Sequence, residues 1–156
     1  MVLSISNNVL TLVHYRLESY DFRAQEKWYN DRLPQYRINL EIPSTTRPDP
    51  EILRMHYVHR QSTHEDAIPL LFCYDMGSSF IEVARIIDAL SEPVTTPPIG
   101  NLGVQAFHVV CPSIPGFGFS DTSQDGDFGL KGTADAFQAL MQRLGYRNYV
   151  THGTGW

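Results

Sequence analysis

The chain contains two kinds of strand-like segment, and their order limits the possible folds more than any other feature. In residues 36–42 and, less regularly, in residues 53–60, apolar and polar residues alternate, which is typical of strands with one face in water. Residues 68–74 and 106–111 are instead almost continuously apolar, which indicates strands covered on both faces, as in a parallel sheet. We therefore expect an exposed or edge strand first and central parallel strands after it.

Helical patterns separate these segments. Residues 80–90 place apolar side chains three or four positions apart, and residues 133–144 do so again before Gly145, a residue type that commonly ends helices. A last short strand is expected at residues 149–152. Because strand, helix, strand, helix and strand follow one another, the sequence predicts an α/β fold with right-handed crossovers, a mostly parallel sheet and helices on its faces.

One more helix is expected before the strands. Residues 21–32 are rich in helix formers, and Asp21 is the expected N-cap. We interpret the aromatic residues Trp28, Tyr29 and Tyr36 as part of a lid or strap that packs on the core, with a recognition surface as the alternative.

Charge and hydropathy exclude several classes of partner. The formal net charge is -5, and the 12 Lys and Arg residues are scattered, so no basic surface for nucleic acid is expected. No run approaches the ~20 apolar residues that cross a bilayer, and residues 1–13 lack the pattern of a signal peptide. We therefore expect a cytoplasmic protein without a membrane segment in this chain, although a longer form could carry an anchor.

No metal site is expected. Cys73 and Cys111 lie in apolar segments, where a reduced thiol packs as a small apolar group. Their number and spacing fit neither a disulfide framework nor a zinc site. His56 and His59 are three positions apart on a predicted strand, so their side chains point to opposite faces and cannot bind one metal ion.

Three loops follow the carboxyl ends of the apolar strands, where reactive groups gather in α/β sheets: residues 74–80, 112–121 and 153–156. The second loop alternates small and aromatic residues, but it lacks the third glycine of a dinucleotide motif and the lysine of a phosphate loop, so no cofactor is expected. Its residues Phe117 and Phe119 either line an apolar small-molecule site or pack in the core.

Several motifs of the chain resemble those of microsomal-type epoxide hydrolases. They are Tyr20-Asp-Phe-Arg-Ala-Gln-Glu-Lys-Trp-Tyr-Asn30, Leu53-Arg-Met-His-Tyr-Val-His-Arg60, Ala67-Ile-Pro-Leu-Leu71 and, most specifically, Pro112-Ser-Ile-Pro-Gly-Phe-Gly-Phe-Ser120. The resemblance runs from Ser19 to the end of the chain and implies the N-terminal part of an α/β-hydrolase fold. It implies an N-terminal extension over residues 1–50 and the first half of the core over residues 51–156, ending at the nucleophile turn.

The resemblance also implies a reaction. Members of this family open an epoxide with an Asp nucleophile and hydrolyse the resulting ester with a His-activated water, which gives a vicinal diol without a cofactor. The implied substrate is a small apolar epoxide. The acid and the His that assist the nucleophile come later in the family sequence than the nucleophile turn.

The nucleophile turn departs from the family pattern. The family reads Gly-Gly-Asp-Trp-Gly where this chain has Gly153-Thr154-Gly155-Trp156, so Gly155 stands at the position of the nucleophilic Asp. Glycine has no side chain that could attack an epoxide carbon. If Thr154 were the nucleophile instead, His152 and Trp156 would flank it, where a tight turn needs small residues.

The loop that should stabilise an oxyanion also differs from the family pattern. The family reads His-Gly-Trp-Pro-Gly-Ser, and this chain reads Tyr74-Asp75-Met76-Gly77-Ser78-Ser79. The backbone N–H groups of Met76 and Trp156 are the candidate oxyanion donors. A carboxylate at Asp75 would oppose a developing negative charge, unless this residue serves as an N-cap or a turn residue.

Together these patterns predict an epoxide hydrolase-like protein, of which this chain is an incomplete and catalytically incompetent fragment. One alternative is a divergent α/β-hydrolase-like protein with another hydrolytic or ligand-binding task. A second alternative is an interaction protein that uses the same half-sheet without catalysis.

Overall fold

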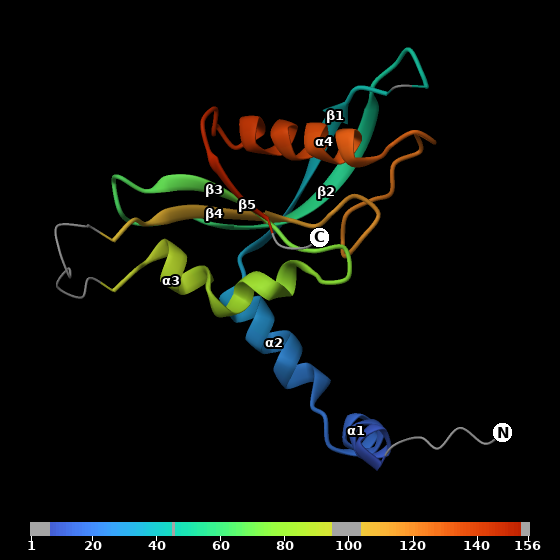
Figure 1. Ribbon diagram of the computed structural model, residues 1–156, viewed down its shortest axis with the longest axis vertical. Helices are drawn as coiled ribbons and strands as arrows, with labels where there is room; N and C mark the ends of the chain where they lie inside the picture. Colours follow the sequence, from blue (N-terminus) through green and yellow to red (C-terminus); the bar gives the residue numbers. More distant parts are fainter. Residues whose placement is uncertain (1–6, 45, 95–103, 154–156) are drawn as a thin grey trace. The chain divides into compact units, whose positions relative to one another are not determined.

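The computed structural model describes residues 7–44, 46–94 and 104–153 (Figure 1). The chain divides into two compact units, Met1–Asp31 and Arg32–Trp156. The five strands found among these residues belong to the second unit, together with the helices that cover them.

The described part of the first unit is helical. It contains α1 (Asn7–Glu18), which has no counterpart among the sequence predictions, and nearly all of α2 (Phe22–Arg32). α2 begins as predicted, because the carboxylate of Asp21 accepts the backbone N–H of Ala24 at 2.9 Å. This bond satisfies one of the N–H groups that a helix leaves without partners at its start.

The aromatic residues of the predicted strap are divided between the two units. Trp28 and Tyr29 pack edge to face in the first unit, with their ring centroids 4.9 Å apart. Tyr36 stacks on Tyr57 in the second unit, with a centroid distance of 5.6 Å. A shared role of these residues as a strap stays a prediction.

The second unit is built on one five-stranded sheet with the order β1-β2-β4-β3-β5. The strands are β1 (Gln35–Ile42), β2 (Glu51–Arg60), β3 (Ile68–Cys73), β4 (Phe107–Pro112) and β5 (Val150–Gly153). As the alternating pattern predicted, β1 lies at an edge, and the continuously apolar β3 lies inside the sheet between β4 and β5. β5 forms the other edge, and all of its residues are exposed.

The five described strands form a mixed sheet, whereas the sequence predicted a mostly parallel one. β3 pairs in parallel with β4 and β5, but β2 pairs antiparallel with both β1 and β4. The connection between β1 and β2, residues 43–50, accounts for the antiparallel β1–β2 pair, because a parallel crossover needs a dozen or more residues. The predicted α/β class with crossover helices holds for the three parallel strands.

α4 (Leu130–Arg143) covers one face of the sheet, and the shorter helical segments cover the other face (Figure 1). α4 begins three residues before the predicted start at Thr133. It ends as predicted, because Gly145 adopts a φ of +89° directly after the capping residue Leu144. A positive φ is accessible to glycine at little cost, which makes it suitable for this position.

The helix predicted over residues 80–90 is divided into two pieces. A 3-10 helix, η1 (Phe80–Arg85), comes first and α3 (Ile87–Ser91) follows. Ile86 lies between them at φ -118°, outside the range of regular helices, and therefore interrupts the predicted helix. The side chain of Ser79 caps η1 by accepting the N–H of Ile81.

The main core lies between α4 and the sheet. Its buried members are Leu40, Ile42, Leu53, Met55, Tyr57, Leu71, Val110, Ala136, Phe137, Leu140 and Met141. Burying a side chain as large as Leu140, which is 0% exposed, contributes on the order of 1.5–3 kcal/mol.

Side chains along β2 alternate between the two faces of the sheet. His56 contacts the ring of Phe80 in η1, with centroids 4.6 Å apart. His59 faces the side of α4, where its Nε2 lies 3.0 Å from the hydroxyl of Tyr146, just beyond the helix. The two histidines therefore lie on opposite faces, as their spacing predicted.

Candidate functional site

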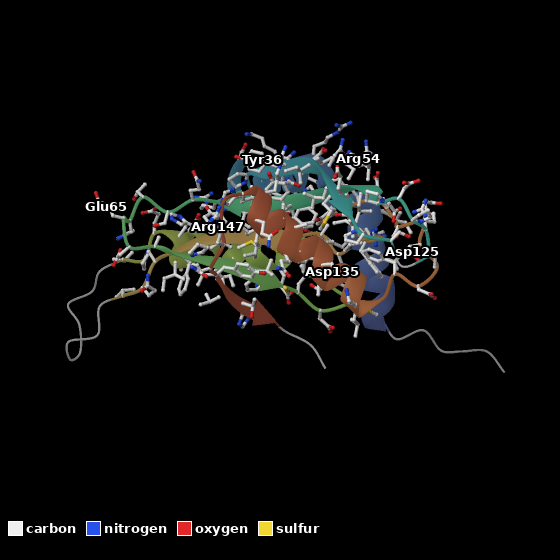
Figure 2. All side chains as sticks on the ribbon, turned by 90° about the horizontal axis from the view of Figure 1, so that it is seen from above. Tyr36, Arg54, Glu65, Asp125, Asp135 and Arg147 are labelled. Carbon is white, nitrogen blue, oxygen red and sulfur yellow. The ribbon has the colours of Figure 1, made fainter. Side chains whose placement is uncertain are left out.

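The loops that follow the parallel strands emerge at one edge of the sheet. β4, β3 and β5 are neighbours and run in the same direction, so their carboxyl ends lie side by side. Figure 2 shows Asp125, in the loop after β4, at one end of the second unit and Glu65, in the turn before β3, at the opposite end. The candidate site therefore lies where β3, β4 and β5 end, on the side of the loop that carries Asp125.

The predicted nucleophile turn can be followed only as far as Gly153, the last residue of β5. Gly155 at the nucleophile position, its alternative Thr154 and the candidate donor Trp156 lie outside the described residues. The assignments made for these three residues remain predictions.

The loop after β3 is a tight turn organised by Asp75. Its backbone carbonyl accepts the N–H groups of Gly77 and Ser78 at 2.9 and 3.0 Å. Its carboxylate Oδ1 accepts the backbone N–H of Met76 at 2.7 Å. Asp75 is thus a turn residue, one of the two structural roles considered for it, while Ser79 provides the helix cap. The Met76 N–H, the candidate oxyanion donor, is directed at a carboxylate of its own loop.

Tyr74 begins this loop and is 5% exposed. Its hydroxyl oxygen accepts the backbone N–H of Ile114 at 3.1 Å. Burial raises the pKa of the Tyr74 hydroxyl above its ordinary value, and hydrogen bonds with Ile114 and with the side chain of Ser113 partly offset this increase. Tyr74 stays neutral at pH 7 and acts as a buried anchor between two loops.

The loop after β4 folds back on β2. The N–H of Ser113 donates to the carbonyl of His56 at 2.9 Å, and the N–H of Asp121 donates to the carbonyl of Arg54 at 2.9 Å. Between these two bonds the chain turns through Gly118, which has a φ of +58°. A Cβ atom at this glycine would lie 2.7 Å from the Ser113 Oγ, so the turn has space only for glycine.

Phe117 and Phe119 project from this turn and are 50% and 51% exposed, so neither is an ordinary core residue. The ring of Phe119 contacts His56, at a centroid distance of 5.2 Å, and Phe80, at 5.6 Å. The guanidinium of Arg37 lies 5.8 Å from the Phe119 centroid, within the range of a cation–π interaction. Phe119 therefore presents one face to the protein and one to solvent.

His56 was considered in the sequence only as a metal ligand, and its role as a buried hydrogen-bonding residue was missed. It is 3% exposed, its Nδ1 lies 2.8 Å from the Ser113 Oγ, and its Nε2 lies 3.1 Å from the Gln35 Oε1. Burial, assisted by the nearby positive charge of Arg37, lowers the pKa of His56 to about 4. The alternation along β2 placed His56 and His59 on opposite faces, but it could not identify the partner Ser113, which is 57 residues away in the sequence.

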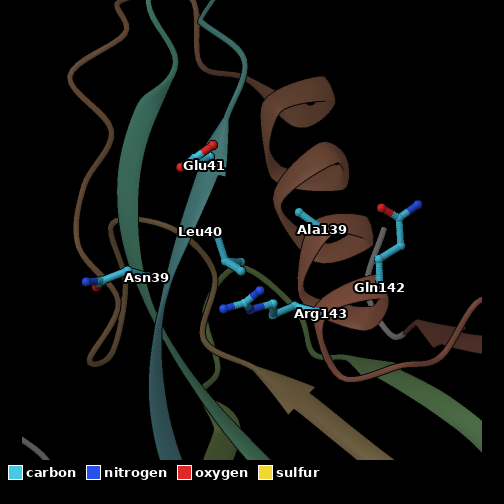
Figure 3. A pocket seen from close by; sticks show the side chains of 6 residues that line it. All are labelled: Asn39, Leu40, Glu41, Ala139, Gln142 and Arg143. Carbon is cyan, nitrogen blue, oxygen red and sulfur yellow. The ribbon is translucent and has the colours of Figure 1, made fainter.

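Two hollows of the second unit lie away from Met76, Phe117 and Phe119. One, of about 460 Å³, is lined by Asn39, Leu40, Glu41, Ala139, Gln142 and Arg143 (Figure 3). Figure 3 shows Leu40 and Arg143 directed into the space between β1 and α4, while Asn39 points away from α4. The other, of about 630 Å³, is lined by Pro34, Tyr36, His59, Arg60, Gln61, Thr63 and Glu92.

Cys73 and Cys111 are both free thiols, partly buried and buried respectively, which agrees with their predicted packing role. Burial raises the pKa of each thiol. Among the described residues, no three His, Cys, Asp or Glu side chains are arranged to hold a metal ion. The helices of the described part are also too short or too polar to cross a membrane.

The sequence model of the family described as "Epoxide hydrolase N terminus" matches residues 5–83, half of the chain. A Stigmatella aurantiaca (strain DW4/3-1) protein named "Putative epoxide hydrolase" is 37% identical to the chain over 145 residues. Epoxide hydrolase 1 of Sus scrofa is 29% identical over 155 residues. These alignments cover 93% and 97% of the chain but only 30% and 31% of the two relatives, so the chain spans less than a third of their length.

Solved structures of epoxide hydrolases share the fold. The Aspergillus niger epoxide hydrolase superposes with a TM-score of 0.73 at 30% identity, covering 96% of this chain and 35% of that one. The juvenile hormone epoxide hydrolase of Bombyx mori superposes with a TM-score of 0.74 at 25% identity, covering 97% and 32%. The predicted α/β-hydrolase fold is confirmed, and with the family match over half of its length this chain belongs to the epoxide hydrolase family.

Proposed function

We propose that this chain is the N-terminal part of an epoxide hydrolase-like protein and that alone it does not convert epoxides to diols. In this proposal residues 1–50 form the family's N-terminal extension, and residues 51–156 form the first half of the α/β-hydrolase core. The alignments with the Stigmatella aurantiaca and Sus scrofa proteins, which cover 30% and 31% of those relatives, support the first part.

The contact between Asp75 and Met76 is the main support for the second part of the proposal, that the chain alone does not convert epoxides. The Met76 N–H would have to point at the oxyanion that forms during ester hydrolysis, but it donates to the Asp75 carboxylate at 2.7 Å. The negative charges of the Asp75 carboxylate and of such an oxyanion would repel each other. At a separation of about 4 Å and an effective dielectric constant of about 20, this repulsion is roughly 4 kcal/mol. A barrier raised by roughly 4 kcal/mol slows a reaction by about a thousandfold.

The sequence of the nucleophile turn supports the same proposal. Gly155 occupies the position of the Asp that would attack the epoxide, and covalent catalysis of this kind requires a nucleophilic side chain there. The chain therefore lacks an attacking group at this position as well as a free donor at Met76.

A small apolar epoxide is the ligand class that the candidate site would take. Phe117 and Phe119 are half-exposed on the loop after β4, which Tyr74 and Ile114 tie to the loop after β3. Aromatic side chains commonly line small-molecule sites, where they bury the apolar part of a ligand.

An assay with styrene oxide tests the activity claim. The purified chain is incubated with styrene oxide at pH 7, and the diol is quantified by chromatography against a buffer blank. We expect no diol above the rate in buffer. Turnover above that rate that disappears in Asp75→Ala or Thr154→Ala would contradict the proposal, and turnover that survives both changes would indicate a contaminating hydrolase.

The gene tests the claim that the chain is part of a longer protein. We expect that reading in frame past the Trp156 codon gives glycine next, then a helical pattern and later an Asp or Glu and a His. A stop codon directly after Trp156 would contradict this expectation. Binding of styrene oxide without conversion in a complete protein would instead favour the alternative of a divergent ligand-binding member.

A further inference from the structure

His56 lies at the junction between β2 and the segments that form the candidate site. It belongs to β2, yet it contacts residues of the loop after β4 and the first residue of η1, which follows the loop after β3. A buried polar side chain at such a junction is stable only when its hydrogen bonds are satisfied, and both ring nitrogens of His56 have partners.

Three backbone and hydroxyl contacts close the turn of residues 113–120 on His56. The N–H of Ser113 donates to the His56 carbonyl at 2.9 Å, and the N–H of His56 donates to the Ser120 Oγ at 3.0 Å. The Ser120 hydroxyl donates in turn to the Ser113 carbonyl at 2.9 Å. The two ends of the turn are thus joined to each other and to one residue of β2.

The imidazole of His56 then holds the aromatic side chains in place. Its ring packs edge to face against Phe80 at 4.6 Å and against Phe119 at 5.2 Å, and Phe80 and Phe119 are 5.6 Å apart. Aromatic pairs of this geometry stabilise their arrangement beyond the effect of the apolar area that they bury. Phe119 is held on its inner face by these two rings while half of its surface remains exposed.

Burial excludes a catalytic role for the pair His56 and Ser113. The distance of 2.8 Å between the His56 Nδ1 and the Ser113 Oγ would suit a base and a nucleophile. Ser113 is 0% exposed, however, and Gly118 passes directly over its hydroxyl, so no substrate could reach it.

We propose that His56 is a positioning residue that fixes the turn of residues 113–120 and thereby sets the position of Phe119. The proposal that Phe119 then forms the wall of a substrate site rests on the proposed function. His56 would act through Phe119 and would not touch the substrate itself.

Hydrogen exchange measured by mass spectrometry on the intact chain tests this role. In His56→Phe, which keeps a ring but removes both side-chain hydrogen bonds, we expect the amides of residues 113–121 to exchange about tenfold faster, while those of α4 do not change. In His56→Asn, whose amide group can replace Nδ1 as a partner of Ser113, we expect much of the protection to return. His152→Phe, on the exposed strand β5, is the matched control and should leave the turn unchanged.

The outcomes separate this proposal from the proposed function. Unchanged exchange of residues 113–121 in His56→Phe, or equal loss in the Phe and Asn variants, would overturn the positioning role. If His56→Phe does not fold, Ser120→Ala carries the test, because it removes the hydroxyl between His56 and Ser113 and should loosen the same turn. Styrene oxide added to the original chain should slow exchange of this turn. If it does not, while the variants behave as expected, the substrate-wall role fails and the positioning role stands.

Discussion

The hydroxyl oxygen of Tyr74 accepts the backbone N–H of Ile114 at 3.1 Å, which ties the loop after β3 directly to the loop after β4. Tyr74 occupies the position at which the family pattern has histidine, so this anchor belongs to a loop that has changed in sequence. The two loops are therefore joined by a side-chain contact as well as by the pairing of their strands.

Replacing Tyr74 by Phe should destabilise the chain by about 1–2 kcal/mol, because the Ile114 N–H loses its acceptor in a partly buried position. The free energy of unfolding can be measured by urea denaturation at micromolar concentration. Tyr149→Phe, which removes the hydroxyl of a partly buried tyrosine, is the control and should change stability by less than about 0.5 kcal/mol. Equal effects of the two changes would count against the anchor.

Asp125 provides a second connection, between the loop after β1 and the loop after β4. Its carboxylate accepts the hydroxyls of Ser44 and Thr46, both at 2.8 Å, and it is 7% exposed. Asp125→Ala should therefore lower the free energy of unfolding by about 2–4 kcal/mol, since hydrogen bonds to charged groups are stronger than neutral ones. Asp127→Ala, two residues further and exposed, should have little effect in the same urea titration.

Much of the fold followed from patterns that repeat along the sequence. The alternation in β1 and the continuous apolar run in β3 predicted which strand lies at an edge and which lies inside. Asp21 and Gly145 predicted a helix start and a helix end, because capping depends on only a few neighbouring residues. The antiparallel pairing of β2 was missed, since the alternation of apolar and polar residues is the same whichever way a strand runs in the sheet.

The site was predicted less completely. The positions of the loops followed from the ends of the strands, but the direction of the Met76 N–H depends on the backbone angles of the turn at Asp75, which residue types alone do not fix. His56 was recognised as a residue on one face of a strand. Its partner Ser113 was not, because the two residues meet only when β2 and β4 pair.

Gly118→Ala tests how tightly the loop after β4 is packed. Gly118 has a φ of +58°, and a Cβ atom there would lie 2.7 Å from the Ser113 Oγ, so we expect a loss of about 2–4 kcal/mol. Gly77→Ala is the matched control, because a Cβ atom at Gly77 would meet nothing within 4 Å. Urea unfolding of the two variants gives the comparison, and similar stability of both would contradict the packing described for Gly118.

The buried histidine also predicts how stability depends on pH. Burial and Arg37 lower the pKa of His56 from 6.5 to about 4. Between these two values the unfolded chain binds a proton at His56 and the folded chain does not, so the stabilising contribution is complete above pH 6.5 and is lost as the pH falls towards 4.

His56→Asn should therefore flatten the decrease of stability between pH 6.5 and 4, where the original histidine contributes a slope of at most about 1.4 kcal/mol per pH unit. The comparison uses urea unfolding of both chains at several pH values, because carboxylates that titrate in the same range affect both chains alike. His152→Asn, at an exposed histidine on β5, should keep the original slope. If the slope is the same with and without the His56 imidazole, this ring is not held neutral by the fold, and its buried contacts with Ser113 and Gln35 must be weaker than their distances imply.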